Sequence, residues 1–247
     1  MKKTISLILC LVFCFACFAP SALAADKVLK VATNVAFPPY EYYEDEKAVG
    51  IDVDIVQAIC DKLGYEMELS DMEFGSIITA VAAGKVDVGF GAITITEERA
   101  KSVNFTTSYS TGIQSIIVKE DSPITGVEDL EAKGIKIGVQ QDTTGDIYAT
   151  DQFGEDHMAR FNKGADAVQA LITGKVNCVI IDNSPAETFV AQNKGLKILP
   201  TAYAEEAYGF ELNKNATELY EEFNGALEEL LKDGTVQKII DKYISAD

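Results

Sequence analysis

The feature that most constrains the fold is a helix–glycine–strand pattern that occurs twice along the chain. One copy spans residues 76–90 and the other spans residues 166–180. In each copy, apolar residues recur at three- and four-residue spacing, a glycine follows (Gly84 or Gly174), and a continuous apolar run comes next. This order is typical of an amphipathic helix, a helix end and a buried strand. Each copy is therefore predicted to be a helix followed by a strand.

A second pair of similar segments lies upstream of the two copies. Residues 28–34 and 135–141 are each predicted to form a short strand that ends in a polar loop. The first leads to a helix predicted over residues 53–63, and the second enters a helix near Thr144. Strands that alternate with helices predict a mostly parallel sheet covered on both faces. Because the unit occurs twice, we expect an α/β fold with two lobes.

Two β-rich runs are expected to connect the lobes. They cover residues 113–119 and 208–212, and helical patterns follow at residues 217–231 and 235–243. We interpret the two runs as paired hinge strands and place the final helices back on the first lobe. The expected boundaries are 25–113 and 209–247 for lobe 1, and 114–208 for lobe 2. Two chain crossings of this kind form a hinge for domain closure.

The N-terminal segment is typical of a secretory signal peptide. Lys2 and Lys3 precede an apolar run over residues 5–19, and Ala22-Leu23-Ala24 follows it. The run is too short for a membrane-spanning helix, which needs about 20 residues. Residues 1–24 are therefore expected to be removed on export to the periplasm or to the outer face of the cytoplasmic membrane. The alternative is a lipoprotein signal in which Cys17 is acylated.

Charge and cysteine content exclude several classes of function. Without residues 1–24 the chain has 19 basic and 39 acidic residues, a net charge of −20. Such a surface repels nucleic acid and anionic lipid. Cys60 and Cys178 are expected to be separate buried thiols in different lobes rather than a disulfide. His157, the sole histidine, is expected at the surface, and the lack of a Cys/His cluster predicts neither metal nor cofactor.

The clearest candidate for ligand binding is Arg99. Ligands of open α/β sheets bind beyond the carboxyl ends of the strands, and Arg99 follows such an end. Thr96 is expected to cap a helix whose first turn holds Glu97 and Glu98. Arg99 and Arg160 are the only arginines, and a guanidinium binds a carboxylate through two parallel hydrogen bonds. The alternative is a surface arginine paired with a nearby acid.

Asp182 ends the corresponding strand of the second lobe with a carboxylate. A charge at the end of an apolar run is costly unless a group pairs with it, and a ligand ammonium would do so. The alternative is that Asp182 caps the helix that begins at Ser184-Pro185. Thr143 and Thr144 place two hydroxyls and several backbone amides at another helix start. That arrangement binds anions, or it is ordinary threonine capping.

Two aromatic residues are candidates for the walls of a binding site. Phe37 opens the segment Phe37-Pro-Pro-Tyr40, which the two prolines hold extended. Phe74 lies in Met72-Glu-Phe-Gly. Either ring is suited to contact the side chain of a ligand, and core packing is the alternative for both.

Acidic residues near the start of the chain raise the question of a metal site. Asp52 and Asp54 resemble a paired-carboxylate motif, but they lead directly into a helix. We therefore expect Asp52 to cap that helix and Asp54 to lie in its first turn. Glu41 and residues 44–46 form a run of acids that we expect in a solvated turn.

The chain resembles a known family from Val28 to Tyr243. It is similar to the polar amino-acid subgroup of the periplasmic-type solute-binding proteins of ABC transporters, which have the two-crossover, type II fold. The motifs that carry the resemblance are Phe37-Pro-Pro-Tyr-Glu, Gly50-Ile-Asp-Val-Asp-Ile, Ile93-Thr-Ile-Thr-Glu-Glu-Arg, Gly138-Val-Gln-Gln-Asp-Thr-Thr-Gly and Val179-Ile-Ile-Asp.

The resemblance implies a role for each residue around a bound α-amino acid. Arg99 would bind the α-carboxylate, with help from the Thr94 hydroxyl and the amides around Thr144. Asp182 would accept the α-ammonium, together with Thr94 and the carbonyl of Ala92. The position of Ala92 is often Gly or Ser in the family, which matters little if the carbonyl makes the contact.

The rest of the pocket would set specificity. Phe37 and Phe74 would sandwich the ligand side chain, and Asn34, Gln140 and Gln141 would line the far end. Relatives that take cationic side chains often have an acid at the position of Asn34. The neutral Asn34 therefore favours a neutral polar ligand such as glutamine over a basic one.

The function implied by the resemblance is capture of a polar amino acid and its delivery to a cognate membrane permease by a monomeric subunit. An enzyme on the same scaffold, similar to a dehydratase, would need a general acid or base in the cleft. No spare histidine, cysteine or lysine lies at the strand ends, and Glu41 is the only nearby acid without a role. The sensor domain of a receptor is a further alternative, and the end of the chain at Asp247 without a spanning helix favours a free subunit.

Overall fold

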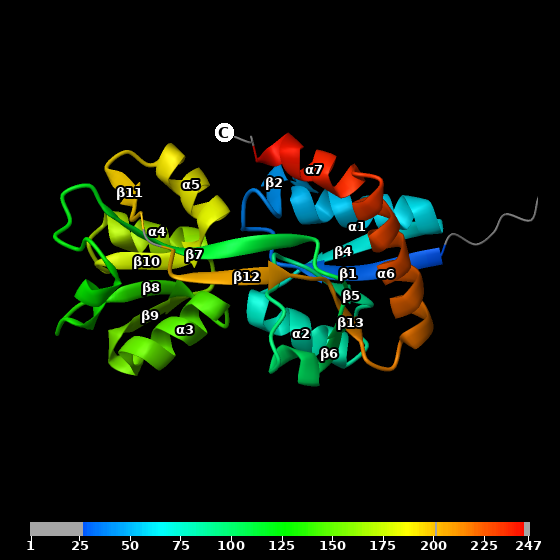
Figure 1. The fold of residues 1–247 in the computed structure, drawn as a ribbon, viewed down its shortest axis with the longest axis horizontal. Coiled ribbons are helices and arrows are strands. Elements are labelled where there is room, and N and C mark those ends of the chain that lie inside the picture. The colour runs from blue at the N-terminus through cyan, green and yellow to red at the C-terminus, as the bar shows by residue number, and fades with distance from the viewer. Residues whose placement is uncertain (1–26, 201, 245–247) are drawn as a thin grey trace, which may run out of the picture.

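The chain folds into two lobes that a two-stranded ribbon connects (Figure 1). The computed structural model describes residues 27–200 and 202–244. The predicted signal peptide, residues 1–24, and the possible acylation site Cys17 lie outside the described residues. The ribbon consists of β7 (Ser110–Lys119) and β12 (Ala204–Tyr208), which pair antiparallel and run between the lobes.

Lobe 1 is built on a five-stranded sheet in the order β4-β1-β5-β13-β6. β1 pairs parallel with β4 and β5, whereas β13 pairs antiparallel with β5 and β6 because it enters the sheet after the second crossing. Helices α1, α6 and α7 cover one face and α2 covers the other (Figure 1). The elements are β1 (Lys27–Thr33), the hairpin β2 (Tyr42–Glu44) and β3 (Lys47–Val49), α1 (Ile51–Leu63), β4 (Tyr65–Asp71), α2 (Phe74–Ala82), β5 (Val88–Gly89), the 3-10 turn η1 (Arg99–Lys101), β6 (Val103–Phe105), β13 (Glu211–Asn213), α6 (Thr217–Lys232) and α7 (Thr235–Tyr243).

Lobe 2 is built on a sheet in the order β11-β7-β10-β8-β9, with β12 beside β7. The pairs β10–β8 and β8–β9 are parallel, and the three strands that contact β7 run antiparallel to it. Each sheet is therefore mixed, with its parallel pairs inside the repeated unit. The remaining elements are the 3-10 turn η2 (Val127–Glu131), β8 (Ile137–Gln140), α3 (Thr144–Phe153), the 3-10 turn η3 (Glu155–His157), β9 (Met158–Phe161), α4 (Gly164–Ile172), β10 (Cys178–Asp182), α5 (Asn183–Gln192) and β11 (Leu196–Ile198).

The repeated helix–glycine–strand unit is confirmed in both lobes. Gly84 follows α2 with φ 67°, and Gly174 follows α4 with φ 75°. Each glycine N–H donates to the carbonyl three residues earlier, Val81 or Leu171, at 3.0 Å. Glycine adopts this left-handed backbone without steric cost, which is why both helices end there. The strand after the first copy is shorter than predicted, at Val88–Gly89.

The connection between the lobes differs in detail from the prediction. β7 pairs with Ala204–Tyr208, which shares only Tyr208 with the run predicted to be its partner. Residues Glu211–Asn213 instead join the sheet of lobe 1 as β13. The two final helices lie on lobe 1 as predicted, where Phe223 and Leu227 of α6 belong to the same apolar core as α1.

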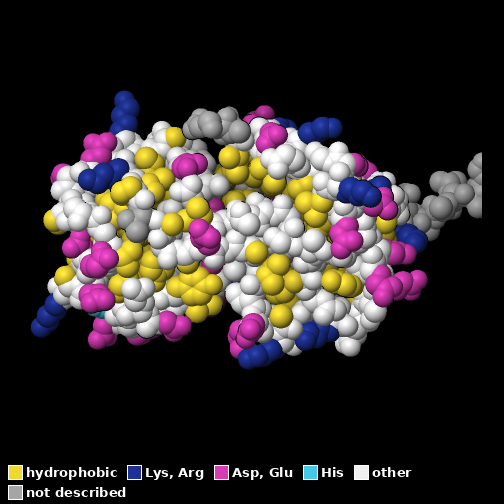
Figure 2. Space-filling view, viewed as in Figure 1, with side chains coloured by type: hydrophobic (Ala, Val, Ile, Leu, Met, Phe, Trp, Pro, Cys, Tyr) yellow, Lys and Arg dark blue, Asp and Glu magenta, His cyan; other side chains and the backbone are white. Residues whose placement is uncertain are grey.

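Cys60 and Cys178 are free and buried in different cores, as predicted. Cys60 belongs to the main core of lobe 1 and Cys178 to a core of lobe 2. His157 is half-buried in η3 rather than fully exposed. Acidic side chains are spread over both lobes in Figure 2. Within the part of the chain that the structure describes, no helix is both long and apolar enough to span a bilayer.

Candidate functional site

A pocket of about 380 Å³, part of which is open to solvent, lies between the two lobes. All ten site residues predicted from the sequence line it, and they come from strand ends and helix starts of both lobes. Glu41, Gly91, Gln114, Glu206 and Tyr208 also line the cavity but were not among the predicted site residues. The full lining is Asn34, Phe37, Glu41, Phe74, Gly91, Ala92, Thr94, Arg99, Gln114, Gln140, Thr143, Thr144, Asp182, Glu206 and Tyr208.

Arg99 is positioned by carbonyl groups of both lobes. Its Nη1 donates to the carbonyl of Thr94 at 3.0 Å, and its Nη2 donates to the carbonyl of Asp142 at 3.1 Å. The guanidinium carbon lies 5.5 Å from the centroid of the Phe74 ring, within cation–π range. Thr96 Oγ1 accepts the Arg99 N–H at 3.1 Å, but the N-cap of this segment is Glu98 and not Thr96 as predicted. The segment is a single 3-10 turn, however, and not the predicted α-helix.

Arg99 has no acidic partner at ion-pair distance among the described residues. Burial lowers its pKa, and the nearby acids Glu211 and Glu206 oppose this shift. The alternative of a surface arginine paired with a nearby acid is therefore excluded for this structure. The guanidinium borders the cavity and remains available to an anion.

Asp182 both caps a helix and borders the cavity. Its Oδ1 accepts the Ser184 N–H at 3.0 Å, which confirms the predicted capping of α5. Its Oδ2 accepts a hydrogen bond from the hydroxyl of Tyr208. The residue is 2% exposed, and burial raises the pKa of its carboxyl group to about 7. The carboxylate thus lacks a cationic partner among the described side chains.

Gly112 leaves the space that the Tyr208–Asp182 pair occupies. A Cβ atom at Gly112 would lie 1.7 Å from the Tyr208 hydroxyl oxygen and 2.6 Å from Asp182 Oδ2. Neither side chain is free to move away from such a Cβ atom, because the Tyr208 hydroxyl is hydrogen-bonded to the Asp182 carboxylate. Any larger residue at this position would displace the pair.

Asp52 fixes the turn that presents Ala92 to the cavity. Its Oδ2 accepts the N–H of Gly91 at 3.1 Å, the N–H of Ala92 at 2.8 Å and the hydroxyl of Tyr109 at 2.8 Å. Ala92 has φ 47°, which costs energy for a residue with a Cβ, and these bonds hold it there. The predicted capping role of Asp52 is wrong, because α1 begins earlier and has Gly50 as its N-cap.

The start of α3 meets lobe 1 across the cavity. Thr143 is the N-cap of α3, and its Oγ1 accepts the Asp146 N–H at 3.3 Å, which confirms the predicted threonine cap. The hydroxyls of Thr94 and Thr144 lie 3.3 Å apart, one from each lobe. The first amides of a helix have no partner within the helix, so this end favours an anion beside Arg99.

The far end of the cavity is closed by two amides. Gln140 Nε2 donates to Asn34 Oδ1 at 3.2 Å, and Asn34 Nδ2 donates to the carbonyl of Met72 at 2.9 Å. Phe37 stacks on Tyr40 with ring centroids 6.1 Å apart, so one face of Phe37 is backed by the core. Gln141 was also expected to line the far end, but it does not line the cavity.

Glu41 lies inside the cavity rather than in a solvated turn, so that prediction is wrong. The backbone reverses over residues 37–41, with the Phe37 N–H donating to the Glu41 carbonyl at 2.8 Å. This turn directs Glu41 inward, where it is 1% exposed and its Oε2 has no hydrogen-bond partner among the described residues. Burial raises its pKa well above the usual range, and Asp52 and Asp182 add to the effect. Residues 44–46 are exposed at the β2–β3 turn, as predicted.

Two further polar residues come from the hinge ribbon. Gln114 of β7 donates from Nε2 to Glu206 Oε2 of β12 at 2.8 Å, and Glu206 Oε1 is buried with no hydrogen-bond partner in the described part of the chain. The cavity wall therefore has three carboxyl groups, Glu41, Asp182 and Glu206, and one guanidinium. Within residues 27–200 and 202–244, no group of three or more His, Cys, Asp and Glu side chains is arranged to hold a metal ion.

Comparison with known proteins places the chain among binding proteins. Residues 29–246 match the family model of the bacterial extracellular solute-binding proteins, family 3. The chain is 32% identical to the arginine-binding extracellular protein ArtP of Bacillus subtilis, with 100% of both chains covered. A solved structure of the arginine-, lysine-, histidine-binding protein ArtJ from Geobacillus stearothermophilus is 34% identical, with TM-score 0.84 over 90% of this chain and 96% of that chain. An ancestral arginine-binding protein bound to glutamine is 38% identical, with TM-score 0.83 over 89% and 98%. The chain therefore belongs to the bacterial extracellular solute-binding proteins, family 3.

Proposed function

We propose that the protein binds one free α-amino acid between Arg99 and Asp182 and delivers it to an ABC permease. The observation that supports this most strongly is that a guanidinium and a carboxyl group face one pocket from opposite lobes, and neither has an ion-pair partner among the described residues. A zwitterion supplies the missing counter-ion to each, a carboxylate for Arg99 and an ammonium for Asp182. The Thr144 end of α3 and the carbonyl side of the Ala92 turn flank these two positions.

The ligand we propose is an amino acid with a cationic side chain, such as L-arginine. A zwitterion pairs with Arg99 and Asp182 and leaves Glu41 and Glu206 without a counter-ion. A buried carboxylate is costly unless a cation or several donors meet it, so one more positive charge fits this wall. The sequence favoured a neutral ligand because Asn34 is neutral. Glu41, from a different position, supplies the acid that Asn34 lacks.

The ligand would act by stabilising a closed form of the two lobes. Thr144 and Asp182 belong to lobe 2, whereas Arg99 and Glu41 belong to lobe 1, so a ligand contacts both sets only after closure. It shifts the equilibrium by the free energy of these added contacts alone. We place the hinge in β7 and β12, at the expected boundaries 113/114 and 208/209. We also propose that a signal peptide over residues 1–24 directs export and that the protein acts as a monomer.

The direct test is to identify what the purified protein carries. Denaturation followed by mass spectrometry of the released small molecules should yield an amino acid. A thermal-shift series with the common amino acids should show the largest rise in melting temperature with L-arginine. L-glutamine as the best ligand would overturn the cationic preference and keep the amino-acid function. No released amino acid and no thermal shift would overturn the function itself.

Catalysis is the second candidate, and Glu41 is the observation that favours it. A carboxyl group with a raised pKa inside a cavity is the type of group that serves as a general acid. Binding remains the preferred function because Glu41 has a sufficient role as counter-ion to a ligand. Incubation with a prephenate-like aromatic precursor, followed by ultraviolet absorbance, would reveal turnover if the protein were a dehydratase.

A further inference from the structure

Asp142 of lobe 2 contacts lobe 1 outside the ligand cavity. A Cβ atom at Gly75, in the first turn of α2, would lie 2.1 Å from Asp142 Oδ2. The carboxylate therefore occupies the place that a side chain at position 75 would take. Asp142 is not among the residues that line the ligand cavity. The contact forms between the lobes, so opening of the hinge must break it.

No side chain of α2 makes a capping hydrogen bond at its own N-terminus. Its N-cap residue, Glu73, makes no side-chain capping bond, and its first turn contains no acid. Glu73 instead accepts a hydrogen bond from Asn162 Nδ2 of lobe 2 at 2.7 Å. A carboxylate beside the first turn of a helix is stabilised by the helix dipole. Lobe 2 thus places the Asp142 carboxylate beside the first turn of α2, which contains no acid of its own.

The same residue also reaches Arg99. The carbonyl of Asp142 accepts a hydrogen bond from Arg99 Nη2 at 3.1 Å, and the guanidinium lies over the ring of Phe74. Asp142 therefore couples two events. Its carboxylate meets Gly75 when the lobes close, and its carbonyl orients the guanidinium of Arg99 toward the ligand.

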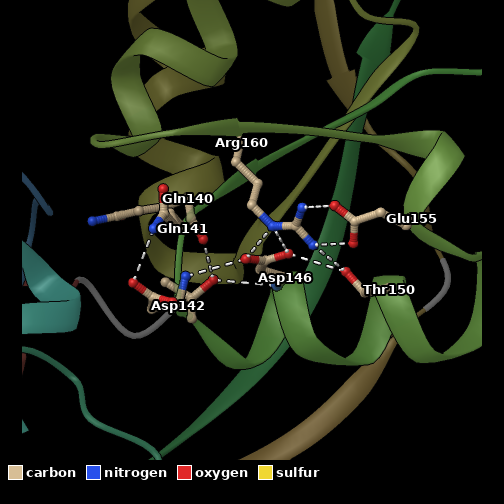
Figure 3. A network of polar contacts seen from close by, with 8 residues as sticks. Gln140, Gln141, Asp142, Asp146, Thr150, Glu155 and Arg160 are labelled. Carbon is tan, nitrogen blue, oxygen red and sulfur yellow. Dashed lines mark hydrogen bonds and ion pairs between the residues drawn. The ribbon is translucent and has the colours of Figure 1, made fainter.

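Asp142 is held in position by a network within lobe 2 (Figure 3). It has φ 65°, a left-handed conformation that aspartate tolerates better than most residues. Its N–H donates to Asp146 Oδ2 at 3.2 Å. Arg160 Nε in turn donates to Asp146 Oδ1 and Oδ2 at 2.8 and 2.9 Å, and its Nη2 donates to Glu155 Oε2 at 2.9 Å. The Arg160–Asp146 ion pair therefore holds the turn at Asp142 through contacts within lobe 2 alone.

We propose that Asp142 is an interlobe latch that docks on the N-terminus of α2 at Gly75 and favours the closed form. It is a positioning residue, because it acts through lobe closure and through Arg99 rather than by contact with the ligand. The latch rests on the proposed function, since closure matters only if a ligand is enclosed. Its effect on affinity would be the same for every amino acid that the cavity accepts.

A double-mutant cycle on Asp142 and Gly75 tests the latch, with calorimetric titration of L-arginine and L-glutamine. Asp142→Gly keeps the turn and its carbonyl but removes the carboxylate, and we expect affinity to fall about 5- to 10-fold. Gly75→Ala favours the helix but blocks the carboxylate, so a fall of about 10-fold is expected. The double variant should be no weaker than Asp142→Gly alone, because the methyl group then meets no carboxylate.

A charge-matched variant and the ligand ratio complete the experiment. Asp151→Asn, an exposed residue of α3, should bind as the wild type does. The ratio of the two amino-acid affinities should stay constant across the cycle, which loss of a contact to the ligand side chain would not produce. An unchanged affinity in Asp142→Gly, or single effects that multiply in the double variant, would overturn the latch. Wild-type protein that binds none of the common amino acids would instead contradict the proposed function.

Discussion

The hydroxyl of Tyr208 donates a hydrogen bond to Oδ2 of Asp182, and both residues are buried at the wall of the interlobe cavity. Tyr208 ends the hinge strand β12, and its backbone also forms an antiparallel bridge with Thr94. Asp182 ends β10 of lobe 2. The bond therefore ties the proposed acceptor of the ligand ammonium to the segment on which the lobes would turn.

Removal of the Tyr208 hydroxyl should weaken ligand binding without unfolding the protein. In Tyr208→Phe the Asp182 carboxylate loses a donor that stabilises its charged form, which raises its pKa further. A hydrogen bond to a charged group contributes about 1.5–3 kcal/mol, so affinity should fall roughly 10- to 100-fold. Calorimetry checks this against Tyr203→Phe, whose hydroxyl contacts only Gln152 outside the cavity. Equal affinity in the two variants would show that the hydroxyl does not orient Asp182.

Stability of the ligand-free protein should fall as the pH rises through neutrality. Burial raises the pKa of Asp182 and of Glu211 to about 7, well above the usual carboxyl values of about 4. The folded state thus holds protons that the unfolded state releases. Their contribution is complete below about pH 4 and is lost as the pH rises through about 7. The melting temperature should drop by roughly 5–10 °C between about pH 5 and pH 8. A flat or rising profile would contradict these assignments, and Asp182→Asn should reduce the slope.

Glu41 should control which amino acid is preferred. In Glu41→Gln the carboxylate proposed to meet a cationic side chain becomes neutral, so affinity for L-arginine should fall about 100-fold, the scale of one buried charge-assisted bond. Affinity for L-glutamine should change less than about threefold. Competition calorimetry with both amino acids gives the ratio, and Glu44→Gln at the exposed hairpin turn is the matched control. An unchanged ratio of the L-arginine and L-glutamine affinities would show that Glu41 does not determine selectivity.

Asp52 should be required for stability rather than for direct contact with the ligand. Asp52→Asn puts an amide where two backbone N–H groups and the Tyr109 hydroxyl now converge. The turn at Ala92 loses its strongest support, and the free energy of unfolding should fall by about 2–4 kcal/mol. Urea unfolding measures this, with Asp61→Asn on the exposed face of α1 as control. A loss below about 0.5 kcal/mol would show that the turn holds without Asp52.

Periodic features of the sequence were sufficient to predict the elements that carry the site. The repeated unit predicted both helices that end at Gly84 and Gly174, and with them the strand ends that bring Arg99 and Asp182 to one cavity. Such patterns depend on burial along a single element, which a sequence shows directly. The capping by Thr143 and Asp182 was predictable for the same reason, because it is local to a few residues.

Interactions between distant segments were the ones that the sequence did not reveal. Glu41 stands in an acidic run, and its burial depends on a chain reversal at residues 37–41. Asp52 lies in a first helical turn, where acids usually face solvent, but its partners are the backbone at Gly91 and Ala92, about 40 residues away. Gly112 and Tyr208 are ordinary strand residues until β7 and β12 bring them to Asp182.

The central claim is that an α-amino acid is held between Arg99 and Asp182. The most direct test is calorimetric titration of Arg99→Ala with the amino acid that the wild-type protein releases on denaturation. Removal of one partner from a buried ion pair costs about 3–5 kcal/mol, so affinity should fall by at least about 100-fold. Near-wild-type affinity in Arg99→Ala, with its fold intact by circular dichroism, would contradict the claim.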